Sequence, residues 1–324
     1  MAVSRSKPFT PSAEQMALWP EVSGNTLNGV GETEDRRPTP IYWHEPERTP
    51  HGRLQDWFRA RAFADESMAA AKRRAAVLKQ ELPPVAPDRR EAGAEDWTRE
   101  VKAVALEAGA DLIGIAETRP EWVFEGFDMP FAGAVMIAVA HDYERLDTAP
   151  SDTALAEIID QYGRGNVIAK AVAGWIREQG WDAHAHGGPD AGPMLLIPPA
   201  VECGFGELGK HGSMISRQLG SNFRLAAVFT DLPLNLDRRD DLGVDDFCAN
   251  CRVCEDACPP DAIYHQPEWV RGTKRWYVDF DLCLPYFNEA KSCGICIAKC
   301  PWSLPGVAPR LGEKRNRRRT RTKG

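Results

Sequence analysis

Eight of the nine cysteines in this 324-residue chain lie within 53 residues, and their spacing is the clearest chemical signal in the sequence. They form two runs, Cys248-x2-Cys251-x2-Cys254-x3-Cys258-Pro and Cys283-x9-Cys293-x2-Cys296-x3-Cys300-Pro. Gaps of two and three residues let consecutive thiolates converge on one cubane from a tight turn, and the fourth cysteine of such a run reaches the other cluster. The sequence therefore predicts two 4Fe–4S clusters and one-electron chemistry.

The same rule assigns four ligands to each cluster. Cluster one is expected to take Cys248, Cys251, Cys254 and Cys300, and cluster two to take Cys258, Cys283, Cys293 and Cys296. The alternative is zinc, which is closed by four ligands from two CxxC-like pairs. Two CxxCxxxCP runs favour a module of the bacterial-ferredoxin type over residues 241–306. Cys203 lies outside it and is expected to be a small buried residue.

The composition is that of a soluble globular protein, with 43% hydrophobic and 27% charged residues. No apolar run is long enough to span a bilayer, and no apolar stretch follows the first basic residues as it would in a secretory signal. We therefore expect a cytoplasmic protein without a membrane partner. Nine cysteines in such a chain argue against disulfides.

The net charge of −7 is unevenly distributed along the chain. Residues 310–324 contain eight Lys/Arg and one Glu, a net of +7, so the other residues sum to −14. A basic segment of this kind could contact nucleic acid or an acidic partner. Because the remainder is acidic, nucleic acid is not expected to be the main ligand, and residues 307–324 are predicted to form a solvated, disordered tail.

Elements that could position a site begin near residue 94. Residues 1–93 resemble an extended arm with two helices, around 52–64 and 66–81. The pattern from 94 to 240 predicts an α/β domain, in which an amphipathic helix precedes a buried strand. Strand-like runs occupy 111–116, 133–140 and 223–230, and a helix is expected over about 153–179, with Gly163 and Gly165 as candidates for a break.

Several blocks of the chain resemble the reductive dehalogenases, which use cobalamin and two 4Fe–4S clusters. The segment YGRGNVIAKAVAGWIREQGWDA (162–183) is similar to a tyrosine-plus-helix block of that family. VECGFGELGKHGSMISRQLGSNFRLAAVFTDLPL (201–234) resembles its glycine-rich block, and 275–302 its second-cluster region. The resemblance covers about 160–305 well and 95–160 more weakly, and the x9 gap is within the family's range.

The resemblance implies an α+β, nitroreductase-like fold that holds base-off cobalamin within residues 94–240. An organohalide would exchange its halogen for hydrogen, with electrons passing from an external ferredoxin, flavodoxin or reductase through the clusters to cobalt. Tyr162 would donate the proton to carbon, and Lys210 would be the cation beside it. A nearby ammonium favours the phenolate and makes a tyrosine, whose free pKa is near 10, a better acid.

The glycine-rich segment 203–212 is too irregular for a nucleotide-binding fingerprint. Its glycines would let the backbone approach a flat ligand such as a corrin ring. The predicted cofactor-binding residues are therefore Gly204, Gly206, Gly209 and His211.

Residues 182–187 fit the D-x-H-x-x-G signature by which other cobalamin proteins donate a histidine to cobalt. That signature belongs to a flavodoxin-like fold, so we interpret the match as accidental. If it were meaningful, His184 would be an axial ligand.

Two other functions compete with dehalogenation. An epoxyqueuosine-reductase-like enzyme would reduce a modified tRNA base with the same cofactors, which would account for the basic tail; that relative uses an aspartate acid, and Asp160 lies two residues before Tyr162. A ferredoxin-like electron carrier would instead reduce corrinoid on another protein. Retention of cobalamin by the purified chain would distinguish an enzyme from a carrier.

Overall fold

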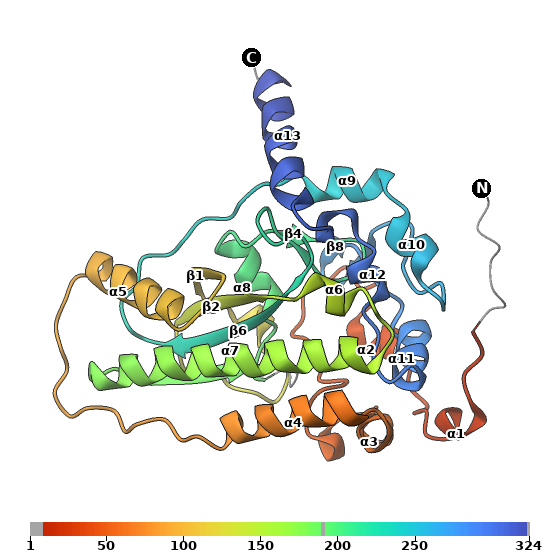
Figure 1. Cartoon of the computed structure of the whole chain (residues 1–324), viewed down its shortest axis with the longest axis horizontal. Coiled ribbons are helices and arrows are strands. Elements are labelled where there is room, and N and C mark those ends of the chain that lie inside the picture. Colours follow the sequence, from red (N-terminus) through yellow and green to blue (C-terminus); the bar gives the residue numbers. More distant parts are fainter. Residues whose placement is uncertain (1–8, 189–191, 323–324) are drawn as a thin grey trace.

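The computed structural model describes residues 9–188 and 192–322 and is built around a four-stranded antiparallel sheet (Figure 1). The strand order is β1-β2-β6-β3, with bounds Leu112–Glu117 (β1), Gly133–Ala140 (β2), Phe223–Thr230 (β6) and Ala183–Gly187 (β3). Three of these strands match the predicted ones, and β3 was not predicted because it alternates alanine with two histidines. Since every pairing is antiparallel, the α+β description holds for this domain.

Both faces of the sheet are covered, which explains why its strands are continuous apolar runs rather than alternating ones. Val135, Ile137 and Val139 of β2 belong to a core shared with α5 (Ala94–Glu107) and α7 (Asp152–Glu178). The intervening residues of β2 face the other way, toward α8 (Ile197–Glu202) and the hairpin β4 (Glu207–Leu208) and β5 (Met214–Ile215). The mixed α/β architecture is confirmed.

Helix α7 runs for 27 residues without interruption, so the expected break at Gly163 or Gly165 is wrong. The Ser151 side chain begins the helix by accepting a hydrogen bond from the backbone N–H of Ala154 at 3.0 Å. A Cβ on Gly165 would lie 3.1 Å from the Cβ of Ala226 in β6. Gly165 therefore serves close packing of the helix on the sheet, which brings α7 side chains near β6 side chains.

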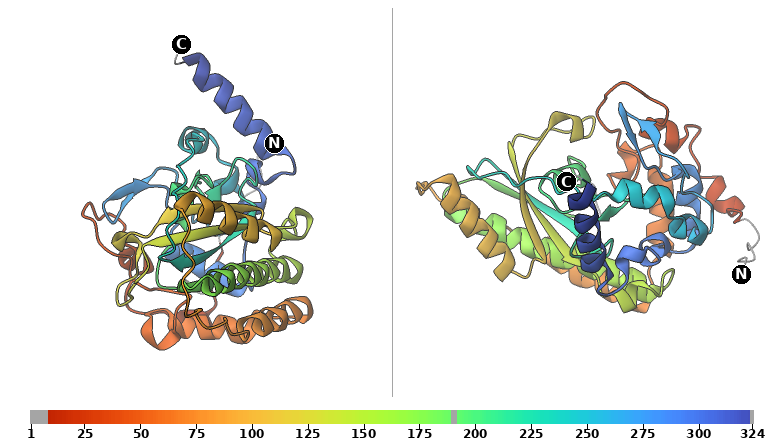
Figure 2. Two further views of the ribbon diagram at one scale, coloured as in Figure 1. Left: turned by 90° about the vertical axis from the view of Figure 1, so that its left-hand side faces the viewer. Right: turned by 90° about the horizontal axis from the view of Figure 1, so that it is seen from above.

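Residues 9–93 wrap around the rest of the molecule. Their helices are α1 (Ala13–Met16), α2 (Gly24–Asn28), η1 (Pro46–Arg48), α3 (Gly52–Arg61) and α4 (Asp65–Leu78). Helix α4 lies alongside α7 (Figures 1 and 2). Further toward the N-terminus, the buried amide of Gln15 donates to the Pro285 carbonyl at 3.1 Å and accepts from Asn288 at 2.9 Å. The arm thus joins the sheet domain to the cysteine-rich module.

The cysteine-rich module is made of short helices and one hairpin. Its elements are α9 (Val244–Asn250), α10 (Val253–Ala257), β7 (Glu268–Val270), β8 (Thr273–Arg275), α11 (Phe280–Glu289), α12 (Ile295–Ala298) and η3 (Pro301–Ser303). The short helix α6 (Tyr143–Leu146) of the sheet domain lies next to this module through Leu146, which packs on Ala298. The sheet domain also contains η2 (Pro120–Trp122).

The predicted disordered tail is wrong for most of its length. Residues Val307–Thr322 form helix α13, which projects away from the body of the protein (Figure 1). Its first turns are anchored because Ala308 and Leu311 pack with Trp302, and Arg315 Nε donates to the Leu242 carbonyl at 2.9 Å. Within residues 9–188 and 192–322, no helix has the length and apolar character needed to cross a membrane.

Candidate active site and cluster-binding module

Tyr162 of α7 and Arg224 of β6 face each other where the helix crosses the sheet. The guanidinium carbon of Arg224 lies 5.5 Å from the centroid of the Tyr162 ring, within the range of a cation–π contact. The ring also lies against Gly188, just after β3, where any side chain would clash with it. The phenol is therefore held by a cation and by a glycine that leaves room for the ring.

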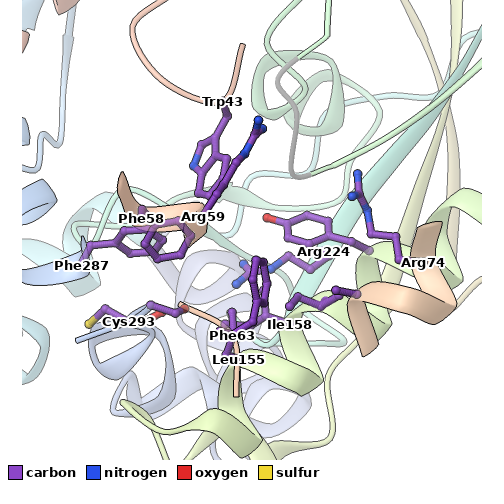
Figure 3. A pocket seen from close by; sticks show the side chains of 14 residues that line it. Trp43, Phe58, Arg59, Phe63, Arg74, Leu155, Ile158, Arg224, Phe287 and Cys293 are labelled. Carbon is purple, nitrogen blue, oxygen red and sulfur yellow. The ribbon is translucent and has the colours of Figure 1, made fainter. Parts of the chain in front are cut away.

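Tyr162 and Arg224 line a cavity of about 310 Å³ between the arm, α7 and the cysteine-rich module (Figure 3). Its walls include four aromatic and two further arginine side chains: Trp43, Phe58, Phe63, Phe287, Arg59 and Arg74. Phe58 and Phe287 stack with their ring centroids 5.0 Å apart, and Cys293 forms part of the same wall. No aspartate or glutamate lines this aromatic cavity within the described part of the chain.

A second cavity, of about 300 Å³, lies on the other side of the same two residues. His186, Gly188, Ser213 and Met214 contribute to its lining, together with several aliphatic side chains. The Nε atom of Arg224 is buried and has no hydrogen-bond partner among the described residues. Buried donors in native proteins nearly always have an acceptor. The Arg224 Nε–H is a donor on this wall for which the described residues supply none.

The predicted pairing of Lys210 with Tyr162 is wrong. Lys210 is only 1% exposed, forms an ion pair with Glu255 and donates to the Cys251 carbonyl at 3.1 Å. It lines neither cavity beside Tyr162. The cation at that position is Arg224, and the sequence does contain a signal for it, since Arg224 is the one charged residue in the apolar strand 223–230.

The structure gives the glycine-rich segment a different role from the predicted one. Gly206 has φ +147°, and a Cβ there would clash with the Ile215 carbonyl. A Cβ on Gly204 (φ +86°) would lie 2.6 Å from the carbonyl oxygen of Arg238. The close approach that these two glycines allow is to protein backbone rather than to a flat ligand.

Gly209 also faces protein atoms, and so does one side of His211, whose Nε2 atom is buried without a hydrogen-bond partner among the described residues. A Cβ on Gly209 would lie 2.8 Å from the His211 ring. The Nδ1 atom of that ring accepts a hydrogen bond from the Ser213 backbone at 3.1 Å, and burial lowers the pKa of His211 to about 4. The segment reaches the second cavity through Ser213 and Met214 instead.

Two other candidates lie outside the aromatic cavity. His184 is on the exposed side of β3 and makes an edge contact with Phe131 at 4.8 Å, whereas its neighbour His186 lines the second cavity. Asp160 forms a two-pronged ion pair with Arg73, with both carboxylate oxygens 2.8 Å from one guanidinium nitrogen. Neither His184 nor Asp160 lines either cavity beside Tyr162, so neither is placed to act there as a ligand or as an acid.

None of the eight cysteines of the two runs forms a disulfide bond, and their mutual electrostatic interactions fall into two groups. Members of one group are Cys248, Cys251, Cys254 and Cys300; members of the other are Cys258, Cys283, Cys293 and Cys296. The grouping coincides with the two ligand sets that the spacing predicts. Cys254 also acts on Cys296, so the two groups are adjacent.

The surroundings of the thiols fit thiolate ligands of a cluster. Burial raises the pKa of Cys254 and of Cys283 to about 12, so a positive centre such as iron is needed to hold them as thiolates. Backbone N–H groups point at the sulfurs: Ala262 donates to Cys258 at 3.4 Å, and Trp302 donates to Cys300. Hydrogen bonds of this kind to cluster sulfurs help to set the reduction potential.

Comparison with known proteins supports the cluster assignment. A family model for a 4Fe-4S dicluster domain matches residues 247–304, so the zinc alternative is wrong. A tetrachloroethene reductive dehalogenase from Desulfitobacterium hafniense is 32% identical over 209 residues, covering 60% of this chain and 37% of that protein. One from Sulfurospirillum multivorans is 28% identical over 275 residues, covering 69% and 54%. The chain thus spans about half the length of these relatives, or less.

Solved structures show the same fold. A variant of the tagged catabolic reductive dehalogenase NpRdhA matches with a TM-score of 0.75 and 23% identity, over 89% of this chain and 45% of that one. An epoxyqueuosine reductase from Leadbetterella byssophila is 36% identical, but over only 123 residues, or 35% of this chain and 39% of that protein. The chain is therefore a homologue of the reductive dehalogenases that contains a 4Fe-4S dicluster domain, and the epoxyqueuosine reductases are its more distant relatives.

Proposed function

We propose that this protein is a corrinoid-dependent reductive dehalogenase, an oxidoreductase that converts R–X, two electrons and a proton into R–H and halide. The observation that carries the proposal is the Tyr162–Arg224 pair on the wall of an aromatic cavity that also contains Cys293, a cluster ligand. A proton donor, a cation and an electron-transfer centre thus border one cavity. This is the set of groups that reductive replacement of a halogen needs.

Two 4Fe–4S clusters are assigned to the two cysteine groups. Cluster two takes Cys258, Cys283, Cys293 and Cys296, and through Cys293 it borders the aromatic cavity. Cluster one takes Cys248, Cys251, Cys254 and Cys300, none of which lines either cavity beside Tyr162. We therefore expect electrons from an external ferredoxin, flavodoxin or reductase to arrive at cluster one.

The corrinoid is assigned to the second cavity, where Ser213, Met214 and His186 would contact it and Arg224 Nε offers an unsatisfied donor. Because the volume is about 300 Å³, the cavity would hold only part of so large a cofactor. When bound, a reduced corrinoid supplies the electrons that cleave a carbon–halogen bond. A solved reductive dehalogenase with the same fold, whose structure suggests a mechanism for B12-dependent dehalogenation, supports this choice of cofactor.

The protein's own residues supply the proton and the environment. The Tyr162 hydroxyl donates its proton to the carbon that loses the halogen, and the Arg224 guanidinium stabilises the phenolate that remains. Phe58 and Phe287 give the cavity an apolar wall, beside which an electrostatic interaction is screened less than in bulk water. Solvent then returns the proton to Tyr162 after each turnover.

The lining favours an aromatic organohalide with an acidic substituent. Aromatic walls suit a planar apolar body, and the Arg224 guanidinium on the same wall suits an acidic substituent. NpRdhA, which has the same fold, was solved in complex with 3-bromo-4-hydroxybenzoic acid. A halophenolate or halobenzoate is therefore the class of substrate to try first.

The deciding experiment is anaerobic reconstitution with iron, sulfide and cobalamin, followed by iron counting, EPR and assay of halide release from halophenols. About eight irons per chain, a base-off Co(II) signal and halide release would support the proposal. About eight irons without bound cobalamin would instead identify an electron carrier.

The epoxyqueuosine alternative has no support at the site, because Asp160 is engaged by Arg73. The cytoplasmic location stays a prediction.

A further inference from the structure

Lys210 is a buried cation with no part in the chemistry described so far, and it lies beside the proposed ligands of cluster one. Its ammonium donates to the Cys251 carbonyl at 3.1 Å and lies 4.8 Å from the centre of the Trp276 ring. Its own backbone N–H is directed at the sulfur of Cys248. Burying an ammonium is costly unless it is paired and hydrogen-bonded, so the partner of Lys210 and the orientation of the pair decide how its charge acts on this ligand loop.

The partner of Lys210 is Glu255, and the pair has a definite orientation. Lys210 is 1% exposed and Glu255 is 9% exposed. The Glu255 carboxylate also contacts His265 Nδ1 at 3.2 Å and Arg252 at 3.5 Å, both of which have side chains more than half exposed. The carboxylate end of the pair therefore faces Arg252 and His265, while the ammonium end faces the loop of Cys248 and Cys251.

We propose that Lys210 tunes cluster one, raising its reduction potential so that this cluster accepts electrons from the external donor. Reduction adds one electron to the cluster and breaks no bond, so the change is one unit of negative charge in a buried site. A fixed ammonium against the ligand loop stabilises that added charge, and net charge and hydrogen bonds to sulfur are what set such potentials. The inference rests on the two clusters of the proposed function but not on the dehalogenation step.

The test is a redox titration of the reconstituted protein, followed by EPR, with variants that separate charge from shape. Lys210→Gln should shift one cluster to a more negative midpoint by at least about 59 mV, which is a tenfold change in the ratio of reduced to oxidised cluster for one electron. Lys210→Arg should restore most of the potential because it keeps the charge. Glu255→Gln should shift the same cluster in the positive direction.

Lys299 offers a matched control. It lies next to Cys300 in the sequence, but it is about half exposed and pairs with Asp147 at 2.7 Å. Solvent screens such a charge, so Lys299→Gln should move either midpoint far less than Lys210→Gln does. Equal shifts from the two lysine variants, or unchanged midpoints in Lys210→Gln, would overturn the assignment.

A variant that loses iron is also informative. If Lys210→Gln cannot hold about eight irons, Glu255→Gln decides the question: a positive shift supports the tuning role and an unchanged midpoint overturns it. None of these measurements requires turnover. Loss of dehalogenation with the expected potentials would count against the proposed function and leave the role of Lys210 in place.

Discussion

The Arg224 guanidinium lies 5.5 Å from the Tyr162 ring centre because α7 packs closely on β6. Gly165, one turn along the helix from Tyr162, approaches Ala226, two residues along the strand from Arg224. The pair therefore sits on two rigid elements whose separation is set by a helix–sheet contact. Fixed geometry of this kind is what a proton donor and its stabilising cation need.

Replacement of Tyr162 by Phe should lower kcat for halide release by at least about 100-fold, because the general acid is removed while the ring that fills the wall remains. Iron and cobalamin content should not change. Tyr143→Phe is the control, since that hydroxyl contacts the Ala298 carbonyl at 3.4 Å and lines neither cavity beside Tyr162. Near-normal turnover in Tyr162→Phe would exclude it as the proton donor.

Replacement of Arg224 should separate charge from geometry. Arg224→Gln removes the cation beside the phenol and is expected to reduce kcat by at least about 100-fold, whereas Arg224→Lys should retain a larger part of the activity. The measurement is kcat and KM across pH with both cofactors quantified. If Arg224→Gln changes only KM, the guanidinium binds the substrate and does not assist Tyr162.

Gly206→Ala should destabilise the protein by about 3 kcal/mol or more, because φ +147° is strained for any side chain and the new Cβ meets the Ile215 carbonyl. Gly93→Ala is the control: that glycine has φ −73°, and no atom lies within 4 Å of a Cβ built there. Gly93→Ala should change the free energy of unfolding by no more than about 0.5 kcal/mol. Anaerobic denaturant unfolding measures both. A stable Gly206→Ala protein that loses cobalamin would restore the cofactor role predicted for this segment.

Stability should fall as the pH drops from 7.5 to 5, in part through His211. Burial lowers its pKa to about 4 from the ordinary 6.5, so between those values the unfolded chain takes up a proton that the folded protein excludes. At pH 5, this one group should lower the free energy of unfolding by about 2 kcal/mol. His211→Asn keeps an acceptor for the Ser213 N–H and removes the titration, so its pH dependence should be shallower. Identical slopes would show that His211 does not contribute.

The elements of the sheet domain were largely predictable because each depends on a continuous local pattern. The apolar runs at 133–140 and 223–230 are strands with the predicted bounds, and the helix expected near 153–179 is α7. Strand β3 escaped prediction because it lies at the sheet edge, where partner strands rather than apolar content decide pairing. Helix α13 escaped because tertiary contacts of Leu311 and Arg315 anchor a segment of highly charged composition.

What the sequence alone determined is the chemistry that depends on spacing along the chain. The two cysteine runs identify a dicluster domain, and their gaps of two and three residues predict how the eight thiols divide between the two clusters. Tertiary structure decided which cation accompanies the phenol. Lys210 and Arg224 both lie in the block that resembles the family, but only Arg224 is on the strand that α7 crosses. Lys210 instead forms an ion pair with Glu255. Distances between side chains on different elements depend on strand register and helix packing. Residue spacing along the chain determines neither of them.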